Sequence, residues 1–534
     1  MQRRYQQLRV ARQPFLEEAR RCAALTIPSL YPPAKLSRGQ KLVEPYQSLG
    51  AHGVKNLAEK ILLSLNPPGR PFFRLSVGHF DVEEQVQRMA LEKAEEMNAA
   101  PEAARTFVEQ MRRIAMAQIE KNLATVERAI VREFELEDNR PTDSEVMKHL
   151  IVGGNAMRYC PQDEDEQPRM YSLEHYVVRR DPDGRVLEQI TCEGVQALSV
   201  SAEVREACGL EEESADSGTT PEYNLYTSIK RSDDGKWWEV EQELNGVAVP
   251  DSDGKYPINV CPWVALRWTK IDGEDYGRGH VSDYRGSLRS LEGLTRALVE
   301  NAAGASRFLL FVNPNSQYGT RVKDVARPPN GAVVVGNAQD VTFLRSEKYN
   351  DLQVPFQQVQ ALYKELGQAF LLNSSTQRNA ERVTAYEMSI MAHEIEVVLG
   401  GTYSTLGKEY QYPILVNLMA RMKKAKKLPN LPDEVEPTIL TGMDALGRSA
   451  DLEKLAQFGQ FLSMFPQQIV AEYLRFSDIF RQGAVAAGID AENILKSEEE
   501  VLQERRQQMQ QALMQQAIGP AINAGAQSEP PVQQ

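Results

Sequence analysis

"VSDYRGSLRSLEGLTRALVENAAG", residues 281–304, carries an unbroken helical pattern. Large apolar side chains return along it every three or four residues, which is the spacing of one face of an α-helix. These apolar positions are Val281, Tyr284, Leu288, Leu291, Leu294 and Leu298. A helix of about 24 residues is roughly 36 Å long, so the stretch predicts a rod.

The same helix carries a second, charged stripe. Its members are Arg285, Arg289, Glu292, Arg296 and Glu300. The last three are spaced four residues apart, which allows ion pairs between successive turns.

A second rod is predicted over residues 351–372, with a length of roughly 33 Å. Val359, Leu362, Leu366 and Phe370 share one of its faces, and Pro355 is tolerable in its first turn. The segment between the rods, residues 308–348, is short, strand-like and rich in turn residues. It concentrates three basic side chains, Arg321, Lys323 and Arg327. A solvated surface patch is the simpler explanation of this cluster, and a docking site for an acidic partner is the functional one.

The second rod is followed by "LLNSSTQRNAERVTAYE", residues 371–387. Its middle, residues 373–382, has no large apolar side chain and two arginines, which predicts a small polar loop between stiff helices. Thr384 and Glu387 then form a capping box. The helix that they start is expected to reach about Tyr410, with a bend at Gly400 and Gly401.

The first half of the chain mixes helices with strands. Residues 82–135 are rich in helix-forming residues, a helix should end at Asn66 before two prolines, and another should start at Glu145 and break at Gly153. Between residues 171 and 270, the turns DPDG (181–184) and DG (234–235) separate β-prone runs and predict hairpins. "CPWVALRWT" (261–269) predicts a further strand.

The bulk composition is that of a globular protein. The net charge of −13 argues against a broad basic surface that grips nucleic acid. Five scattered cysteines without a CxxC pair indicate reduced thiols rather than zinc sites. The N-terminus is too charged for a secretory signal, and no apolar run is long enough to suggest a transmembrane helix.

Several short motifs resemble cofactor or metal sites but are incomplete. "YGRGHVS" (276–282) has Gly277 and Gly279 but Ser282 in place of the third glycine of a dinucleotide fingerprint, so a tight strand-to-helix turn is favoured over a nucleotide-dependent oxidoreductase. His393 and Glu394 lack the second histidine of a zinc hydrolase, because Val397 occupies its place. "DSDG" (251–254) predicts a turn rather than a calcium loop, and no ATP-binding P-loop is present. We therefore expect no catalytic residues, metal or cofactor.

Longer strings, in order along nearly the whole chain, resemble portal proteins, the head-to-tail connectors of short-tailed podovirus-type bacteriophages. They include "RCAALTIPSLYP", "KNLAEKILLSLNPP", "IVGGNAMRY", "YVVRRDPDGRVLEQIT", "DGEDYGRGHVSDYRGSLRSLEGL", "LLNSSTQRNAERVTAYE", "LGGTYS" and "PTILTGMDALGRSADLEKL". The ordered set carries the resemblance, and no single short motif does. The N-terminus and the glutamine-rich C-terminal tail are least alike.

The resemblance implies an α+β, mainly helical portal fold. Its expected parts are a wing (1–277), first stem helix (278–307), clip (308–349), second stem helix (350–372), tunnel or valve loop (373–382), long bent helix returning to the wing (383–448), and crown with a disordered tail (449–534). It implies a dodecameric ring at one capsid vertex, made in the host cytoplasm and retained in the virion. Double-stranded DNA would enter the capsid through its channel during packaging and leave during ejection.

The resemblance also implies partners and site residues. The partners are the terminase large subunit, a tail adaptor protein, the major capsid and scaffolding proteins, and internal core proteins, with no membrane. The clip cluster becomes a terminase and tail docking surface, and the charged stripe belongs to the stem. The valve-loop residues would face DNA, with Arg378 as the main cation; they are Asn373, Ser374, Ser375, Thr376, Gln377, Arg378, Asn379 and Arg382. By default, Arg378 and Arg382 are ordinary loop arginines.

Overall fold

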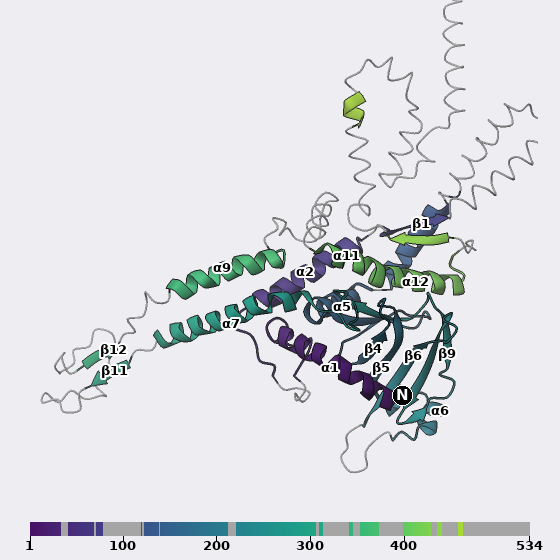
Figure 1. Cartoon of the computed structure of the whole chain (residues 1–534), viewed down its shortest axis with the longest axis horizontal. Helices are drawn as coiled ribbons and strands as arrows, with labels where there is room; N and C mark the ends of the chain where they lie inside the picture. Colours follow the sequence, from purple (N-terminus) through teal and green to yellow (C-terminus); the bar gives the residue numbers. More distant parts are fainter. Residues whose placement is uncertain are drawn as a thin grey trace, which may run out of the picture. The chain divides into compact units, whose positions relative to one another are not determined.

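The computed structural model describes residues 1–33, 41–68, 71–77, 119, 122–137, 139–211, 221–305, 309–312, 341–344, 353–372, 399–428, 435–439 and 458–462. The described residues up to 439 belong to one compact unit, whereas residues 458–462 belong to a second. The first unit combines helices with antiparallel sheets (Figure 1). No helix among the described residues is both long and apolar enough to cross a bilayer.

The predicted hairpins form the largest sheet, which has six strands in the order β4-β5-β6-β7-β8 with β9 paired to β7. The strands are β4 (Tyr176–Arg180), β5 (Val186–Gln196), β6 (Glu222–Arg231), β7 (Trp237–Leu244), β8 (Val247–Ala248) and β9 (Gly254–Pro257). Both predicted turns are confirmed, because Gly184 and Gly235 adopt positive φ angles of 86° and 70° that favour glycine. "DSDG" is likewise a turn between β8 and β9.

A second sheet of three strands is more deeply buried. It consists of β10 (Trp263–Arg267), β2 (Asn155–Tyr159) and β3 (Arg169–Tyr171), in that order. The predicted strand in "CPWVALRWT" is therefore confirmed, but it pairs with β2 and not with the neighbouring hairpins. Every residue of β2 and β10 is buried, which explains their largely apolar sequences.

Helices enclose this buried sheet on one apolar core. The contributing helices are α1 (Gln2–Ala24), α2 (Leu49–Leu65), α5 (Asn139–Gly153), α7 (His280–Ala305) and α9 (Gln353–Ala369). Helix α1 also packs on β4 of the larger sheet (Figure 1). The predicted end of α2 at Asn66 is confirmed. The start predicted for α5 at Glu145 is six residues too late, because Asn139 begins the helix and Pro141 fits in its first turn.

A smaller core lies where the N-terminal and later parts of the chain meet. Strand β1 (Phe73–Val77) pairs with β13 (Val435–Ile439) in an antiparallel ribbon. Leu123, Val126 and Ile130 of a helical segment, residues 122–136, pack there against α12 (Tyr412–Lys424). The remaining short elements are α6 (Ala202–Ala207), β11 (Leu309–Val312) and β12 (Val341–Leu344), and the last two pair with each other. Most of the helical prediction for residues 82–135 lies outside the described residues.

Candidate functional site: two long helices and the base of the polar loop

The two predicted rods are confirmed as α7 and α9, which run side by side (Figure 1). Val281, Leu288 and Leu291 of α7 are fully buried. From α9, Val359, Leu362 and Leu366 are buried in the same core. The two helices are also linked by a hydrogen bond of 3.0 Å from Ser287 Oγ to Glu365 Oε1. The apolar spacing in the sequence therefore corresponds to a real packing seam.

The start of α7 is fixed by close backbone packing. A Cβ atom on Gly279 would lie 2.7 Å from the Ile151 carbonyl oxygen, and one on Gly277 would lie 2.9 Å from the Gly154 carbonyl oxygen. Asn155 Nδ2 donates to the Gly277 carbonyl at 2.7 Å, and its Oδ1 accepts from the Gly277 N–H at 2.7 Å. The two glycines thus form the predicted tight turn, and the packing leaves no room for a pyrophosphate between them and α5.

The charged stripe of α7 does not act as one surface. Arg296 pairs with Glu300 at 2.8 Å, as its spacing predicted. Glu292 instead accepts the backbone N–H groups of Tyr46 and Gln47, at 2.9 and 3.2 Å. Arg285 forms an ion pair with Glu18 of α1, while Arg289 is exposed. Tertiary partners have therefore replaced the expected pairing of Glu292 along the helix.

Helix α9 ends in a Schellman motif just before the predicted polar loop. The Leu372 N–H donates to the Gly367 carbonyl at 2.7 Å, and the Leu371 N–H donates to the Gln368 carbonyl at 3.1 Å. Leu371 occupies the left-handed position of this motif, with φ of 54°. Glycine usually fills that position, because a side chain there costs about 1–2 kcal/mol.

Side chains from α2 and α7 bind the carbonyl groups at this helix end. Asn56 Nδ2 lies 3.1 Å from the Phe370 carbonyl oxygen and 3.2 Å from that of Leu371. Lys60 Nζ donates to the Leu371 carbonyl at 2.6 Å. His280 Nε2 donates to the Ala369 carbonyl at 3.0 Å. Burial lowers the pKa of His280 despite this hydrogen bond, so the ring is neutral at neutral pH.

The ring of Phe370 completes the attachment. It is fully buried and meets the His280 ring edge-on, with 5.5 Å between ring centroids. It also lies so close to Gly53 of α2 that a Cβ atom there would be 2.6 Å from the ring. Small size at position 53 is therefore what lets α2 and the end of α9 come together.

Helix α2 also holds the chain on the far side of the loop. The described chain resumes at Leu399. Gly400, with a positive φ of 40°, lies between Leu399 and the start of α11 (Gly401–Leu406). Three side-chain contacts then reach the C-terminal end of α2; they are Tyr403 OH to Ser64 Oγ (2.8 Å), Asn66 Nδ2 to Tyr410 OH (2.9 Å) and Gln411 Nε2 to the Leu65 carbonyl (2.5 Å).

The helix after Gly400 reaches Tyr410, as expected, and extends beyond it. It passes through a π-helical turn (Gly407–Gln411) and continues as α12 to Lys424. Inside the π turn, Glu409 reaches the buried Arg267 of β10, with 2.5 Å between Oε1 and Nη2. This tertiary partner, which the local sequence does not reveal, accompanies the wider turn.

The predicted site residues divide into two groups. The charged stripe and both rods lie within the described residues. The polar-loop residues 373–382, the basic cluster Arg321, Lys323 and Arg327, the capping box at Thr384 and the His393 motif all lie outside them. Asn56, Lys60, His280 and Gly53 were missed by the sequence reasoning. The only signal for the first two is their i,i+4 spacing on one face of α2, which many surface helices share.

Among the described residues, no group of three or more His, Cys, Asp or Glu side chains is placed to hold a metal ion. The contacts in this region hold the chain in place. One helix, α2, fixes the chain on both sides of residues 373–398, while α7 supports the nearer side.

Comparison with known proteins assigns this arrangement to a class of phage connector. Residues 1–495 match the family model described as bacteriophage head to tail connecting protein. The chain therefore belongs to the bacteriophage head-to-tail connecting protein family. The portal protein of Escherichia phage T7 is 33% identical over 512 residues, covering 95% of this chain and 90% of the T7 protein.

Other relatives agree with this assignment. The portal protein of Pseudomonas phage phiKMV is 30% identical over 94% of this chain and 93% of its own length, and that of Enterobacteria phage SP6 is 29% identical over 97% and 94%. These matches confirm the resemblance to portal proteins and, at the level of the family, a portal role in a phage. Nothing in them supports the oxidoreductase alternative.

A chain from the neck of a native gene transfer agent particle, computed with C12 symmetry, is similar at a TM-score of 0.32 and 10% identity. The similarity covers 66% of this chain and 80% of that one. A likeness this low adds nothing to the family assignment.

Proposed function

We propose that twelve copies of the chain close into a ring at one vertex of the capsid. Double-stranded DNA passes through its channel into the head during packaging and out of it during ejection. Family membership and the match to portal proteins over about nine-tenths of their length support this proposal. Closure by rotation requires two different faces on each subunit, so the ring interface is heterologous.

Each part of the subunit takes a role in this ring. The wing comprises residues 1–277, and α7 and α9 are the stem. Residues 308–349 form the clip, whose Arg321, Lys323 and Arg327 meet the terminase large subunit and the tail adaptor protein. Residues 383–448 return to the wing, and residues 449–534 form the crown. Major capsid, scaffolding and internal core proteins are the remaining partners, and no step of the function is enzymatic.

The valve loop, residues 373–382, forms the narrowest part of the channel. The observation that carries this role is the double attachment to α2, with Asn56 and Lys60 before the loop and Leu65 and Asn66 after it. A constriction works only when its base stays in place while its tip moves. Small polar residues let the tip move along a phosphate backbone, and Arg378 of each copy adds one positive charge near the axis.

The acidic character of the chain suits a conduit. Each phosphate that a protein neutralises adds affinity for DNA. A subunit with a net charge of −13 limits such binding, so DNA is guided at a few cationic points and is not held along the wall.

Assembly is tested by native mass spectrometry and by projection images of the purified protein. Rings with a central channel are expected, whereas a strictly monomeric chain under assembly conditions, or a solid particle, contradicts the proposal. The loop is tested by Arg378→Ala, which should leave rings intact but reduce DNA packaging or retention. Failure of this variant to form rings would make Arg378 structural.

The anchorage of the loop is tested by the double variant Asn56→Ala and Lys60→Ala. Rings should form, while packaged DNA is lost more readily, because the base of the loop is released. Lys55→Ala is the matched control, since Lys55 is exposed on the same helix and makes no hydrogen bond or ion pair to α9 among the described residues. Equal DNA retention in the wild type and the double variant would show that the contacts of Asn56 and Lys60 have no role in retaining DNA.

A further inference from the structure

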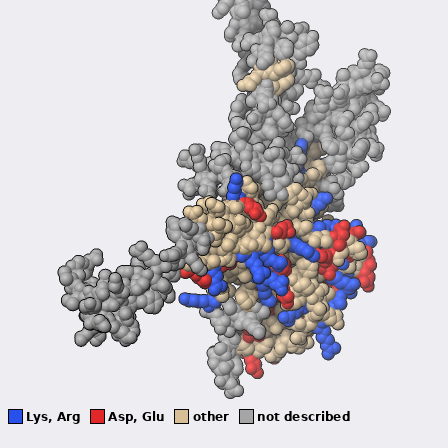
Figure 2. All heavy atoms as spheres, turned by 60° about the vertical axis from the view of Figure 1, so that its left-hand side comes forward, with Lys and Arg blue, Asp and Glu red and all other residues tan. Residues whose placement is uncertain are grey.

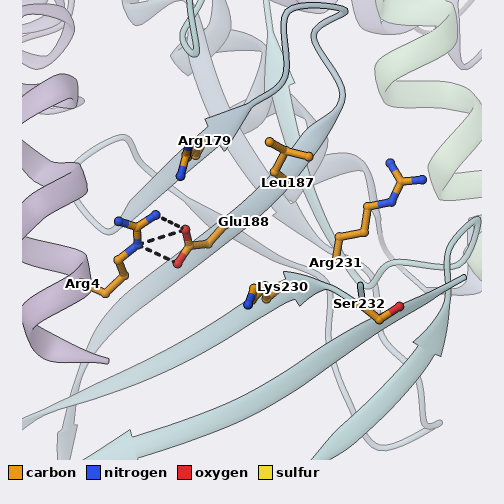
Figure 3. Close-up of a pocket in the computed structure, with 7 residues that line it drawn as sticks. All are labelled: Arg4, Arg179, Leu187, Glu188, Lys230, Arg231 and Ser232. Carbon is orange, nitrogen blue, oxygen red and sulfur yellow. Dashed lines mark hydrogen bonds and ion pairs between the residues drawn. The ribbon is translucent and has the colours of Figure 1, made fainter. Parts of the chain in front are cut away.

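A hollow on the larger sheet gathers basic side chains in an otherwise acidic protein. It has a volume of about 500 Å³, which is in the range of ligand-sized pockets. Helix α1 supplies Arg4, strands β4, β5 and β6 supply five residues, and Ser232 follows the end of β6 (Figure 3). The lining residues are Arg4, Arg179, Leu187, Glu188, Lys230, Arg231 and Ser232. The lining thus contains four cations and one carboxylate.

Strand register explains how these charges come together. Arg179 lies opposite Glu188, and Glu188 lies opposite Lys230, so the three share one face of the sheet. Lys230 in turn lies opposite Glu239 of β7. Opposite residues on neighbouring strands have Cβ atoms about 5 Å apart. The row thus alternates in charge across four strands.

Both carboxylates of the row are bound by cations from elsewhere. Arg4 holds Glu188 with Nη2 at 2.6 Å from Oε2 and Nε at 3.0 Å from Oε1 (Figure 3). Lys255 lies 3.4 Å from Glu239. As a result, Arg179 and Lys230 are both exposed and have no ion-pair partner in the part of the chain that the structure describes. Figure 2 shows basic side chains prominent on one face of this unit.

Charge complementarity indicates which kind of partner would bind Arg179 and Lys230. We propose that this pocket binds a short acidic segment of another protein, whose carboxylates pair with Arg179 and Lys230. The guanidinium groups present paired N–H donors that match a carboxylate. Glu188 bound to Arg4 shows within the chain the contact that the incoming carboxylates make.

Double-stranded DNA fits the pocket less well. A duplex is a long, convex polyanion that binds through many cations in series. The adjoining hollow shares Lys230 and Arg231 but also contains Asp233, Asp234 and Glu239. Hydrogen bonds from Ser232 and Lys236 lower the pKa of Asp234, so its negative charge stays in place to repel a phosphate chain. A short segment can use the basic pocket without crossing this neighbour.

The acidic run of a second copy is not the occupant. In residues 163–166, Asp163 is already paired with Lys424 at 2.8 Å, and Glu164 with Lys427 at 2.8 Å. Glu166 accepts from the Tyr159 hydroxyl at 2.7 Å. This run therefore does not supply the occupant, and the proposed segment belongs to a different protein with its own cluster of Asp and Glu.

The test measures binding of fluorescein-labelled hexaglutamate to the full-length protein by fluorescence anisotropy, with labelled hexaglutamine and a duplex DNA oligonucleotide as other probes. The double variant Arg179→Gln and Lys230→Gln should weaken hexaglutamate binding at least tenfold. It should retain the wild-type fold and assembly, because both side chains are exposed. The matched control, Arg21→Gln and Lys55→Gln, removes the same charges at exposed positions on α1 and α2 and should bind like the wild type.

Binding should also weaken as salt is raised, because the attraction is between largely exposed charges. Hexaglutamate binding that is absent, or equal in wild type and the pocket variant, overturns the proposal. A larger loss with duplex DNA than with hexaglutamate also overturns it and assigns the pocket to nucleic acid.

Discussion

The two halves of α7 lie in opposite environments. In the inner half, Val281, Leu288 and Leu291 are fully buried beside the sheet of β2 and β10. In the outer half, Leu294 and Leu298 are only half-buried, and Val299 is 49% exposed. The same apolar periodicity thus gives a buried inner half of α7, called the root below, and a largely exposed outer half, called the shaft. The described part of the subunit packs closely only against the root.

Ion pairs in these two regions differ in the same way. Beneath the root, Arg158 and Asp143 are 2.7 Å apart, and each side chain is 1% exposed. On the shaft, Arg296 and Glu300 are 2.8 Å apart, with exposed fractions of 61% and 55%. Distance alone would rank the pairs as equal, whereas solvent screening makes their contributions to stability very different.

The largest effect is expected from Asp143→Asn, which leaves the Arg158 guanidinium buried without a counter-charge. The free energy of unfolding should fall by about 3–5 kcal/mol. Asn139 Oδ1 still accepts from Arg158 Nη2, at 2.5 Å, but a neutral acceptor cannot replace the carboxylate. Urea unfolding followed by tryptophan fluorescence measures the change, because Trp263 and Trp268 are buried in this core.

A second variant separates the loss of the pair from general damage. Adding Arg158→Met to Asp143→Asn removes the unpaired charge and should recover part of the lost stability. If the double variant is less stable than Asp143→Asn alone, the unpaired guanidinium is not the cause of the loss.

The next effect depends on pH and concerns His149 of the same core. Burial lowers its pKa to about 4, and its ring packs edge-on against Tyr31, with centroids 4.9 Å apart. The unfolded chain takes up this proton near pH 6.5 and the folded chain only near pH 4. The unfolded state therefore binds more protons between these values, and stability falls as the pH is lowered through that window.

The loss should amount to about 3 kcal/mol and be complete below about pH 4. His149→Phe keeps an aromatic ring beside Tyr31 and removes the titrating group. Unfolding free energies of the wild type and this variant are compared from pH 7 to pH 4, so that contributions from other groups cancel. Parallel curves over the whole range would show that the His149 ring is not kept neutral by the fold.

The sharpest comparison of the two halves is between Leu288→Ala and Leu298→Ala. Truncation of a fully buried leucine costs about 2–5 kcal/mol, while the half-buried Leu298 should cost about 1 kcal/mol. Both variants make the same substitution in the same helix. The difference of about 2 kcal/mol between their losses of unfolding free energy therefore reports burial alone. Equal losses in urea unfolding would mean that the shaft is as well covered as the root.

The root and the shaft also show what the sequence could predict. Regular spacing of large apolar residues was enough for α7, α9 and their facing sides, and glycine-containing turns were enough for the hairpins. These features depend on residues that are near one another in the chain. The extension through the π turn to Lys424 accompanies a distant partner, Arg267, which local patterns do not reveal. The start of α5 was placed too late, although Pro141 is tolerated in a first turn.

The candidate site was only half predictable for the same reason. The polar character of residues 373–382 is visible in the sequence, and its role stays a prediction. The attachment of its base is not visible, because Asn56 and Lys60 precede Leu371 by more than 300 residues. Leu371 even conceals the helix end, since a left-handed position occupied by leucine gives no glycine signal.

A smaller effect of opposite sign is expected from Gly293→Ala on the shaft. A Cβ atom added there meets no atom within 4 Å among the described residues. Alanine favours a helix over glycine by about 1 kcal/mol, so the subunit should become more stable to urea. Gly279→Ala at the root is the counterpart and should be destabilising, because its Cβ would lie 2.7 Å from a carbonyl oxygen. A stabilised subunit that no longer forms rings would place Gly293 against a neighbouring copy.

The smallest effect is expected from Glu300→Gln, which breaks the Arg296 pair by the same kind of substitution as Asp143→Asn. Both side chains lie in water, so their attraction is screened and each is well solvated alone. Subunit stability in urea should not change measurably, and rings should form as in the wild type. A loss comparable to that of Asp143→Asn would mean that this pair is desolvated in the assembled protein, because only exclusion of water makes a single exposed pair so costly to break.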